Sequence, residues 1–367
     1  MQRTHRLLAL AVLCVAAAAG NGRADEASAV EALKKVGAKF VVDDKAPGKP
    51  VVEVDLSFSK LTDADLKPLT ELKTPFVLNL GYTGITDEGA KVIKDLKTVQ
   101  ILYLGQTKIT DAALADVGKL PNLWKLSLFG TGITDDGLKH VGEMKQMRQL
   151  FLNGTKISDA GLKHLGGLSQ LQTLHMEKAK VGDAGLKELS GLKELKELNL
   201  NETQVTDAGL KHLKGLSKLE WLDLRAAPVK DDGLKDLNGL KGLKLLNLSA
   251  TKVTGAGFKD LTELPALENL NLYDAPVAPD ALKHLKQFPK LKTLTLTGDA
   301  ASDATLKDLK GLPLVELYLY KCKVTDAGVE SLKEMKGLKT LKLGGSAVTA
   351  KGLEELKKAL PGAKIEQ

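Results

Sequence analysis

The sequence contains very little cysteine, with two residues among 367. Cys14 lies in an apolar run near the amino terminus, and Cys322 is the one cysteine beyond it. A chain that keeps one cysteine after processing cannot form an intrachain disulfide, which excludes a small disulfide-stabilised fold. The fold must therefore depend on its apolar core, and we expect Cys322 to be a buried, unreactive thiol.

Motifs that carry chemistry are also missing. We find no glycine-rich phosphate loop, no zinc-ligand spacing and no nucleophile elbow in the sequence, so it predicts no enzyme, no cofactor and no metal. Aromatic residues make up 4% of the chain, which makes the position of each ring informative. After the first residues no segment is apolar enough to insert into a membrane.

The first 24 residues have the pattern of an export signal. A basic start, "MQRTHR", is followed by the 13-residue apolar run "LLALAVLCVAAAA" and by "GRA" before Asp25. This pattern predicts a secretory signal peptide over residues 1–24, removed after Ala24. Removal takes away three arginines and no acids, so the net charge falls from +7 to +4. We expect the mature protein to be exported from a bacterial cell, to the periplasm or the exterior.

A repeated phrase dominates the remaining chain. "TGITDDGLKHVGEMKQM" at 131–147 returns as "TKISDAGLKHLGGLSQL" at 155–171 and as "TQVTDAGLKHLKGLSKL" at 203–219. Alignment on the paired leucines gives thirteen units from residue 52 onward, spaced by 24 residues except for one spacing of 23 between 292 and 315. A fixed period of this length is typical of a solenoid.

Each unit has two halves with different periodicities. Leu198 and Leu200 alternate with polar residues, as in a strand with one buried face, and Leu210, Leu213 and Leu216 recur every three residues, as in a short helix. Neither half can bury its leucines alone, so neighbouring units must stack, with strands in a parallel sheet and helices opposite. Because helices are thicker than strands, we expect the stack to bend with the sheet on the concave side.

The unit resembles the leucine-rich-repeat family. The segment "LKELNLNETQV" at 195–205 matches the signature L-x-x-L-x-L-x-x-N/C-x-L, with Thr203 in place of Asn or Cys. The continuation "ITDAGL" resembles repeats of F-box partner proteins and of exported bacterial repeat proteins. The resemblance implies an α/β horseshoe over residues 52–367, with residues 25–51 as an amino-terminal cap of a helix and a strand. With threonine at most of these turn positions, we expect a side-chain ladder built from hydroxyls.

The aromatic residues gather at positions that the repeat leaves free. Every tryptophan and tyrosine falls at an inner-face position of its unit, and two phenylalanines join them: Trp124, Trp221, Tyr82, Tyr103, Tyr273, Tyr318, Tyr320, Phe129 and Phe151. Exposed rings on a groove floor are typical of binding hot spots, although rings also favour strands for structural reasons. We expect one group on the early strands and another around Tyr318 and Tyr320.

A polar stretch lies between the two groups. The candidate ligand-binding residues of the concave face are therefore Tyr103, Trp124, Phe129, Phe151, His175, Glu177, Asn199, Asn201, Trp221, Asp223, Arg225, Tyr273, Tyr318 and Tyr320. His175 with Glu177 has the composition of a general base with an orienting acid, but no nucleophile accompanies the pair. Aspartates such as Asp135, Asp159 and Asp207 follow a Thr or Ser and suit helix starts better than calcium.

The sequence therefore predicts a monomeric, non-catalytic binding module that presents its concave sheet to a protein partner. Recognition of cell-wall or extracellular polysaccharide remains an alternative, because rings can stack on sugar faces. A third reading, an F-box-like substrate receptor, lacks an F-box segment. Nucleic acid is disfavoured because acids interleave the lysines. The unit at 292–314, with Ala301 at a core position, predicts a local break in the curvature.

Overall fold

The computed structural model describes residues 22–72, 74 and 76–367. The predicted signal peptide, residues 1–24, lies outside the described residues except for its last three, which begin the first helix. Within the described ranges, no helix has the length and apolar character needed to cross a bilayer.

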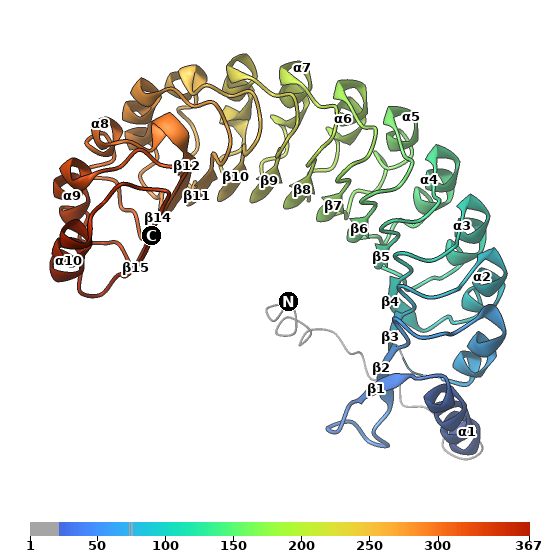
Figure 1. Ribbon diagram of the computed structural model, residues 1–367. Helices are drawn as coiled ribbons and strands as arrows, with labels where there is room; N and C mark the ends of the chain where they lie inside the picture. Colours follow the sequence, from blue (N-terminus) through green and yellow to red (C-terminus); the bar gives the residue numbers. More distant parts are fainter. Residues whose placement is uncertain (1–21, 73, 75) are drawn as a thin grey trace.

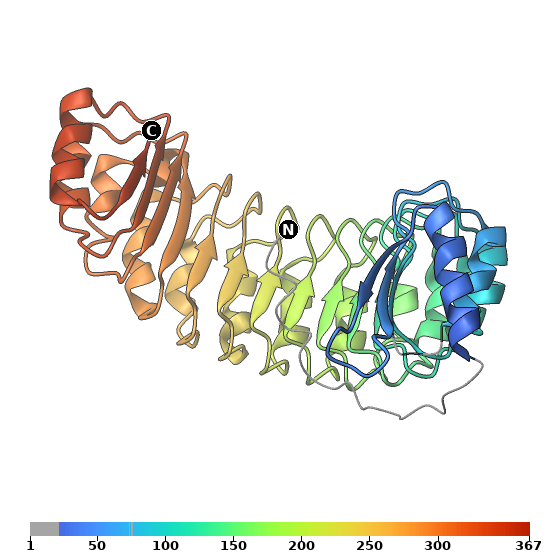
Figure 2. The ribbon, with the colours of Figure 1, turned by 90° about the horizontal axis from the view of Figure 1, so that it is seen from below.

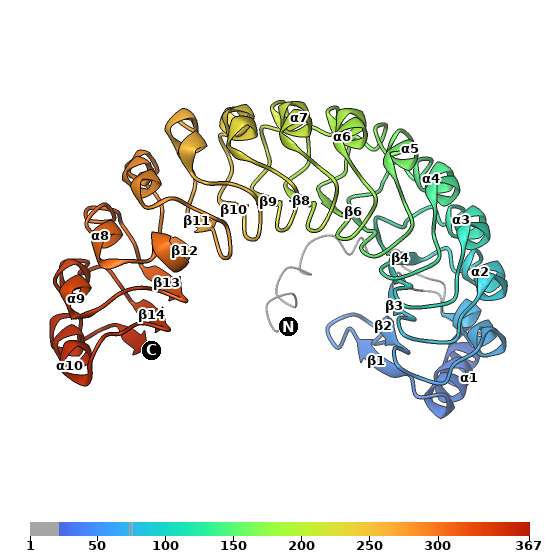
Figure 3. The same ribbon diagram turned by 45° about the horizontal axis from the view of Figure 1, so that its top comes forward.

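The chain forms an arc with the sheet on its concave side and the helices on its convex side (Figures 1 and 3). This arrangement confirms the predicted horseshoe. The strands of the described residues are β1 (Lys39–Val42), β2 (Val51–Asp55), β3 (Phe76–Asn79), β4 (Val99–Tyr103), β5 (Lys125–Ser127), β6 (Gln149–Phe151), β7 (Thr173–His175), β8 (Glu197–Asn199), β9 (Trp221–Asp223), β10 (Leu245–Asn247), β11 (Asn269–Asn271), β12 (Thr293–Thr297), β13 (Glu316–Tyr320), β14 (Thr340–Gly344) and β15 (Lys364–Glu366).

The helical half of the unit takes two forms. The α-helices are α1 (Gly22–Lys35), α2 (Asp87–Ile93), α3 (Asp111–Val117), α4 (Asp135–Val141), α5 (Asp159–Leu162), α6 (Asp183–Leu189), α7 (Asp207–Leu210), α8 (Asp303–Leu306), α9 (Asp326–Lys333) and α10 (Ala350–Ala359). The tighter 3₁₀ segments are η2 (Asp63–Glu71), η3 (Lys211–Leu213), η4 (Asp231–Gly239), η5 (Ala256–Asp260), η6 (Pro279–Gln287) and η7 (Gly298–Ala300).

Strand follows strand in chain order across one sheet of fifteen strands in the described residues, as Figure 2 shows from the concave side. β1 pairs antiparallel with β2, and every later pair is parallel. The register places Leu198 opposite Leu174 and Leu222, and all three are fully buried. Each such side chain removed from water contributes about 2 kcal/mol, and a neighbouring unit makes that burial possible.

The first unit is covered by the segment before it. Ala29 and Leu33 on α1 are buried, and α1 lies against η2. The exposed end of a solenoid needs such a cover because its last leucines would otherwise face water. This contact supports our proposal that residues 25–51 form a cap for a solenoid of residues 52–367.

A left-handed residue turns the chain at the end of each strand from β2 to β14. The column runs through Phe58, Tyr82, Gln106, Gly130, Gly154, Lys178, Glu202, Ala226, Ala250, Asp274, Gly298, Lys321 and Gly345. Left-handed backbone costs a non-glycine residue about 1–2 kcal/mol. In return, the N–H of Tyr82 donates to the Gly105 carbonyl of the next unit at 2.8 Å, and Gln106 donates to Phe129 in the same way.

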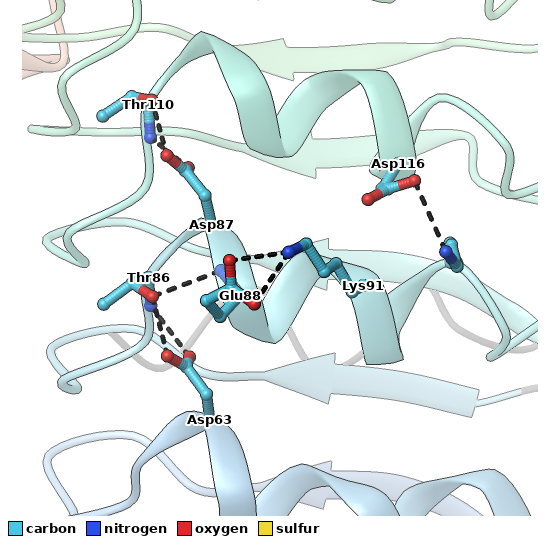
Figure 4. A network of polar contacts seen from close by, with 8 residues as sticks. Asp63, Thr86, Asp87, Glu88, Lys91, Thr110 and Asp116 are labelled. Carbon is cyan, nitrogen blue, oxygen red and sulfur yellow. Dashed lines mark hydrogen bonds and ion pairs between the residues drawn. The ribbon is translucent and has the colours of Figure 1, made fainter.

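A second set of hydrogen bonds joins the units at the helix starts (Figure 4). The Asp63 carboxylate accepts the backbone N–H of Thr86 at 2.9 Å and its hydroxyl at 2.7 Å. The Thr86 hydroxyl also accepts the N–H of Glu88 and caps α2. The pairs that use both groups are Asp63–Thr86, Asp87–Thr110, Asp111–Thr134, Asp135–Ser158, Asp183–Thr206, Asp231–Thr254, Asp303–Thr325 and Asp326–Thr349.

These aspartates therefore do more than begin helices, because each one links two units. The Thr349 N–H and hydroxyl lower the pKa of the Asp326 carboxyl, since both donate to its charged form. The link weakens where the partner lacks a hydroxyl: Gly182 and Lys230 donate only their backbone N–H groups, to Asp159 and Asp207.

The expected hydroxyl ladder at the turn is wrong in its direction. The hydroxyls of Thr83, Thr107 and Thr131 each donate to a leucine carbonyl three residues back in their own unit, at 2.6, 2.7 and 2.6 Å. They close the turn inside the unit and do not join it to the next one. The polar ladder between units runs through the aspartates at the convex side.

The glycine of the "DAG" phrase is required by the same link. A Cβ at Gly161 would lie 2.5 Å from Asp135 Oδ1, the carboxylate that holds Ser158. We predict that Gly161→Ala lowers the free energy of unfolding by about 1–3 kcal/mol, because the added methyl must displace this carboxylate. Gly191→Ala is the matched control, since its Cβ would have 3.7 Å to the nearest atom. Urea unfolding of both variants measures the difference, and equal stabilities would contradict the steric role of Gly161.

Candidate functional site

Side chains that alternate with the buried leucines point away from the core, and they form columns across the concave face. The sheet register aligns Tyr103, Ser127, Phe151, His175 and Asn199 in one such column. The rings on these strands are half-buried, whereas the rings fully inside the core are phenylalanines such as Phe258 and Phe288. Tryptophan and tyrosine therefore stay out of the core.

The central concave cluster consists of Phe151, His175, Glu197 and Trp221. The His175 ring meets the edge of Phe151 at 4.9 Å between centroids and lies 5.4 Å from the Trp221 ring. Nε2 of His175 is buried without a hydrogen-bond partner. It lies 3.8 Å from Glu197 Oε2, too far for a hydrogen bond. The nearby His175 nevertheless lowers the pKa of the Glu197 carboxyl.

The sequence paired His175 with the wrong carboxylate. Glu177 lies two residues along the same side of the chain, but its Oε1 is 3.5 Å from the Lys178 ammonium. Glu197 belongs to the neighbouring strand, where Thr173 is its register partner and His175 its diagonal neighbour. The 24-residue register could have identified it. Within residues 22–72, 74 and 76–367, no three potential metal-ligating side chains gather.

The polar residues beside this cluster are held by the backbone. The Oδ1 atoms of Asn199 and Asp223 accept the N–H groups of Asn201 and Arg225, at 2.9 and 2.8 Å. Asn199 and Asn201 are only 8% and 6% exposed, so both offer less surface than the sequence led us to expect. Arg225 is exposed.

The amino-terminal concave cluster consists of Tyr103, Trp124, Lys125 and Arg148. The Lys125 ammonium lies 5.4 Å from the ring centroids of both Tyr103 and Phe151, within range of a cation–π interaction. Nε1 of Trp124 donates to Gln100 Oε1 at 3.5 Å. Among the described residues, Lys125 and Arg148 have no acidic oxygen within 4.0 Å. Sequence analysis gave Lys125 no role, although its strand position was visible.

The carboxyl-terminal concave cluster consists of Tyr273, Tyr318 and Tyr320. Tyr273 and Tyr320 meet edge to face with centroids 5.4 Å apart. The Tyr318 hydroxyl donates to Glu316 Oε2 at 3.1 Å, and burial and this carboxylate raise the pKa of Tyr318. All three tyrosines thus lie together, as expected for the second group of rings.

Charges at the strand entrances are largely neutralised between units. Lys244 lies 2.7 Å from Glu220, and Lys292 lies 3.0 Å from Glu268. The concave face therefore carries paired charges in its carboxyl-terminal half, while the cations Lys125 and Arg148 lie in its amino-terminal half.

Tyr82 and Phe129 lie off the strands. We expected Tyr82 on the inner face, but it occupies the left-handed turn after β3. There it stacks on Phe58 with centroids 4.4 Å apart and lies 6.5 Å from Phe129. Sequence analysis did not single out Phe58, although the 24-residue alignment puts it directly before Tyr82 in the same column. We call Phe58, Tyr82 and Phe129 the turn patch.

Comparisons with known proteins find relatives of this architecture. The family model of a leucine-rich repeat region matches residues 55–307. No curated protein matches the chain. Among solved structures, an internalin from Listeria monocytogenes is 21% identical with a TM-score of 0.65, and the match covers 94% of each chain.

Two further structures share the fold. A leucine-rich-repeat protein from Leptospira interrogans is 24% identical, with a TM-score of 0.53 over 85% of this chain and 95% of the other. The ectodomain of a plant membrane receptor kinase from Arabidopsis thaliana, in complex with Casparian strip integrity factor 2, is 17% identical. Its TM-score is 0.54, over 87% of this chain and 45% of the other. At these identities the similarity concerns the fold.

We predict that Asp223→Asn is more favourable for stability at neutral pH than in acid. Burial raises the pKa of Asp223, so its ionised form destabilises the folded state as pH rises through that raised value. The amide keeps the acceptor for Arg225 but loses the bond from Asn247 at either pH. Urea unfolding of both proteins at about pH 7 and about pH 3.5 tests this. An identical difference at the two pH values would contradict it.

Proposed function

Because the chain belongs to the leucine-rich-repeat family, we propose that it is a non-catalytic binding module that takes a protein partner on its concave sheet. Members of the family commonly mediate protein–protein interaction. The fold supplies a rigid inner surface whose side chains can vary without disturbing the leucines, which is the property that such a scaffold requires.

One observation carries the proposal: half-buried tyrosine and tryptophan rings alternate with fully buried leucines on the concave strands. In β13, Tyr318 and Tyr320 flank Leu319, which is 0% exposed. Such rings are already partly ordered by their neighbours, so covering them costs little conformational entropy and buries a large area.

The spread of the clusters favours a macromolecule. Tyr103 on β4 and Tyr318 on β13 are nine strands apart in the sheet, which is roughly 40 Å at ordinary strand spacing. A single small ligand cannot span that length, whereas a protein surface or an extended chain can. The unpaired Lys125 and Arg148 at one end and the neutralised charges at the other would orient a protein partner along the groove.

The predicted signal peptide supports placing this function outside the cytoplasm, in the periplasm or the exterior of a bacterial cell. An extended polysaccharide is the alternative occupant of the same face, and the two occupants are separated by experiment. The His175–Glu197 pair has no accompanying nucleophile among Phe151, Trp221 and Thr173, its nearest named neighbours, which supports a binding role.

We predict that Phe151→Ala/Trp221→Ala and Tyr318→Ala/Tyr320→Ala each weaken capture of the partner by at least about tenfold, because each removes two concave anchors. Quantitative pull-down from cell-envelope extract, with the bound protein identified by mass spectrometry, measures the loss. Lys139→Ala/Lys163→Ala, on the convex helices, is the matched control and should retain capture.

A glycan array run with the same variants tests the other occupant. Saturable glycan binding that is lost in the ring variants, with no protein captured, would replace the proposed partner by a polysaccharide. Capture that survives both ring variants but is lost in the convex control would move the interface to the helices and refute the proposal. Melting temperatures show whether each variant remains folded.

A further inference from the structure

The turn patch exposes two large rings at positions that disfavour large side chains. Phe58 is 75% exposed and Tyr82 is 48% exposed, and both have left-handed backbone, with φ of 59° and 58°. Their rings are nearly parallel, with 12° between planes. A bulky side chain with positive φ is a conformational outlier, and exposed apolar rings gain nothing from the core.

The same turn does without a ring elsewhere in the chain. The equivalent position holds glycine at Gly130 and Gly154, where positive φ carries no steric cost, and it holds glutamine at Gln106. The repeat therefore has no structural need for Phe58 or Tyr82. Two adjacent units that both accept the strain and the exposure point to a role in contact with another molecule.

Lysines without acidic partners surround these rings. Lys35 and Lys60 line one shallow recess together with Phe58, Gly37 and Ser59. Lys108 stands at the position of the next turn but one that corresponds to Lys60. All three lysines are exposed, and no acidic oxygen of the described residues lies within 4.0 Å of them.

We propose that the turn patch is a second docking surface, outside the concave sheet, for an acidic peptide segment that carries an apolar or aromatic side chain. The apolar side chain covers the Phe58 and Tyr82 rings while its neighbouring carboxylates approach Lys35 and Lys60. Phe129, 6.5 Å from Tyr82, extends the apolar surface toward the concave strands. This inference does not require that the concave face bind anything.

The surroundings favour a peptide over a sugar. Besides the lysines, the recess is lined by Val36, Gly37, Ser57 and Ser59. These residues offer no carboxylate or amide side chain to accept bonds from sugar hydroxyls, whereas a phenyl ring beside ammonium groups matches an apolar side chain next to an acid.

A displayed library of random short peptides, panned on the purified protein and depleted on Phe58→Gly/Tyr82→Gly, tests the proposal. We expect the enriched peptides to combine Asp or Glu with Phe, Trp, Tyr or Leu. Their affinity, measured by fluorescence anisotropy on synthesised peptides, should fall at least about tenfold in Phe58→Gly/Tyr82→Gly and should also fall in Lys35→Gln/Lys60→Gln. Added salt should weaken binding, because the lysines are exposed.

The controls use the same column. Gln106→Gly changes an equivalent turn without removing a ring, and Tyr318→Ala/Tyr320→Ala disables the concave face, so binding in both should stay within about twofold of the wild type. Phe58→Gln/Tyr82→Gln repeats the test with the residue that Gln106 shows the turn accepts. Glycine relieves the left-handed strain, so the melting temperature of Phe58→Gly/Tyr82→Gly should be unchanged or higher.

Enrichment of neutral or basic peptides, or of none, would overturn the proposal, as would equal loss of binding in Gln106→Gly. Binding of acidic glycans through these rings, without peptide binding, would also overturn it. Loss in Tyr318→Ala/Tyr320→Ala alone would assign the peptides to the concave face, so this test fails independently of the proposed function.

Discussion

No single repeat of this protein has a complete core, and the burial of its leucines depends on the repeat that follows. A strand and a helical turn of 24 residues can surround one side of Leu198, and Leu222 and Leu174 supply the others. Hydrophobic burial thus acts between units, so the chain is stable only as a stack. Shape, surface and function all follow from that dependence.

The polar links decide how closely the units approach. On the convex side, an aspartate accepts two hydrogen bonds from the next unit, and a glycine leaves space for its carboxylate, as Asp135 does with Ser158 and Gly161. On the other side, a left-handed residue lets a backbone N–H reach across. Since both sides are tied at each step, the bend set by helix and strand thickness is repeated from one unit to the next.

This convex link is interrupted once along the described residues. Gly255 stands where the next aspartate would be, and the following unit joins by a backbone bond from Ala278 to Thr254. Ser302 instead bonds Thr305 within its own unit, and the aspartate link resumes at Asp303. The irregular segment around Ala301 adds the 3₁₀ turn η7, and strands β12 to β14 lengthen to five residues. Tyr318 and Tyr320 lie directly beyond this joint.

The repeat itself was readable from the sequence because leucine spacing reports directly on which side chains must be buried. The period, the horseshoe, the concave sheet and the group of Tyr273, Tyr318 and Tyr320 all follow from counting residues. The sequence could not show that Glu197 lies nearer His175 than Glu177 does, or that Lys125 lies between two rings, because these contacts join side chains of different strands. Nor could it show that Tyr82 leaves the sheet for a left-handed turn and stacks on Phe58. Local pattern determines which residues are buried; only packing between units determines which exposed residues meet.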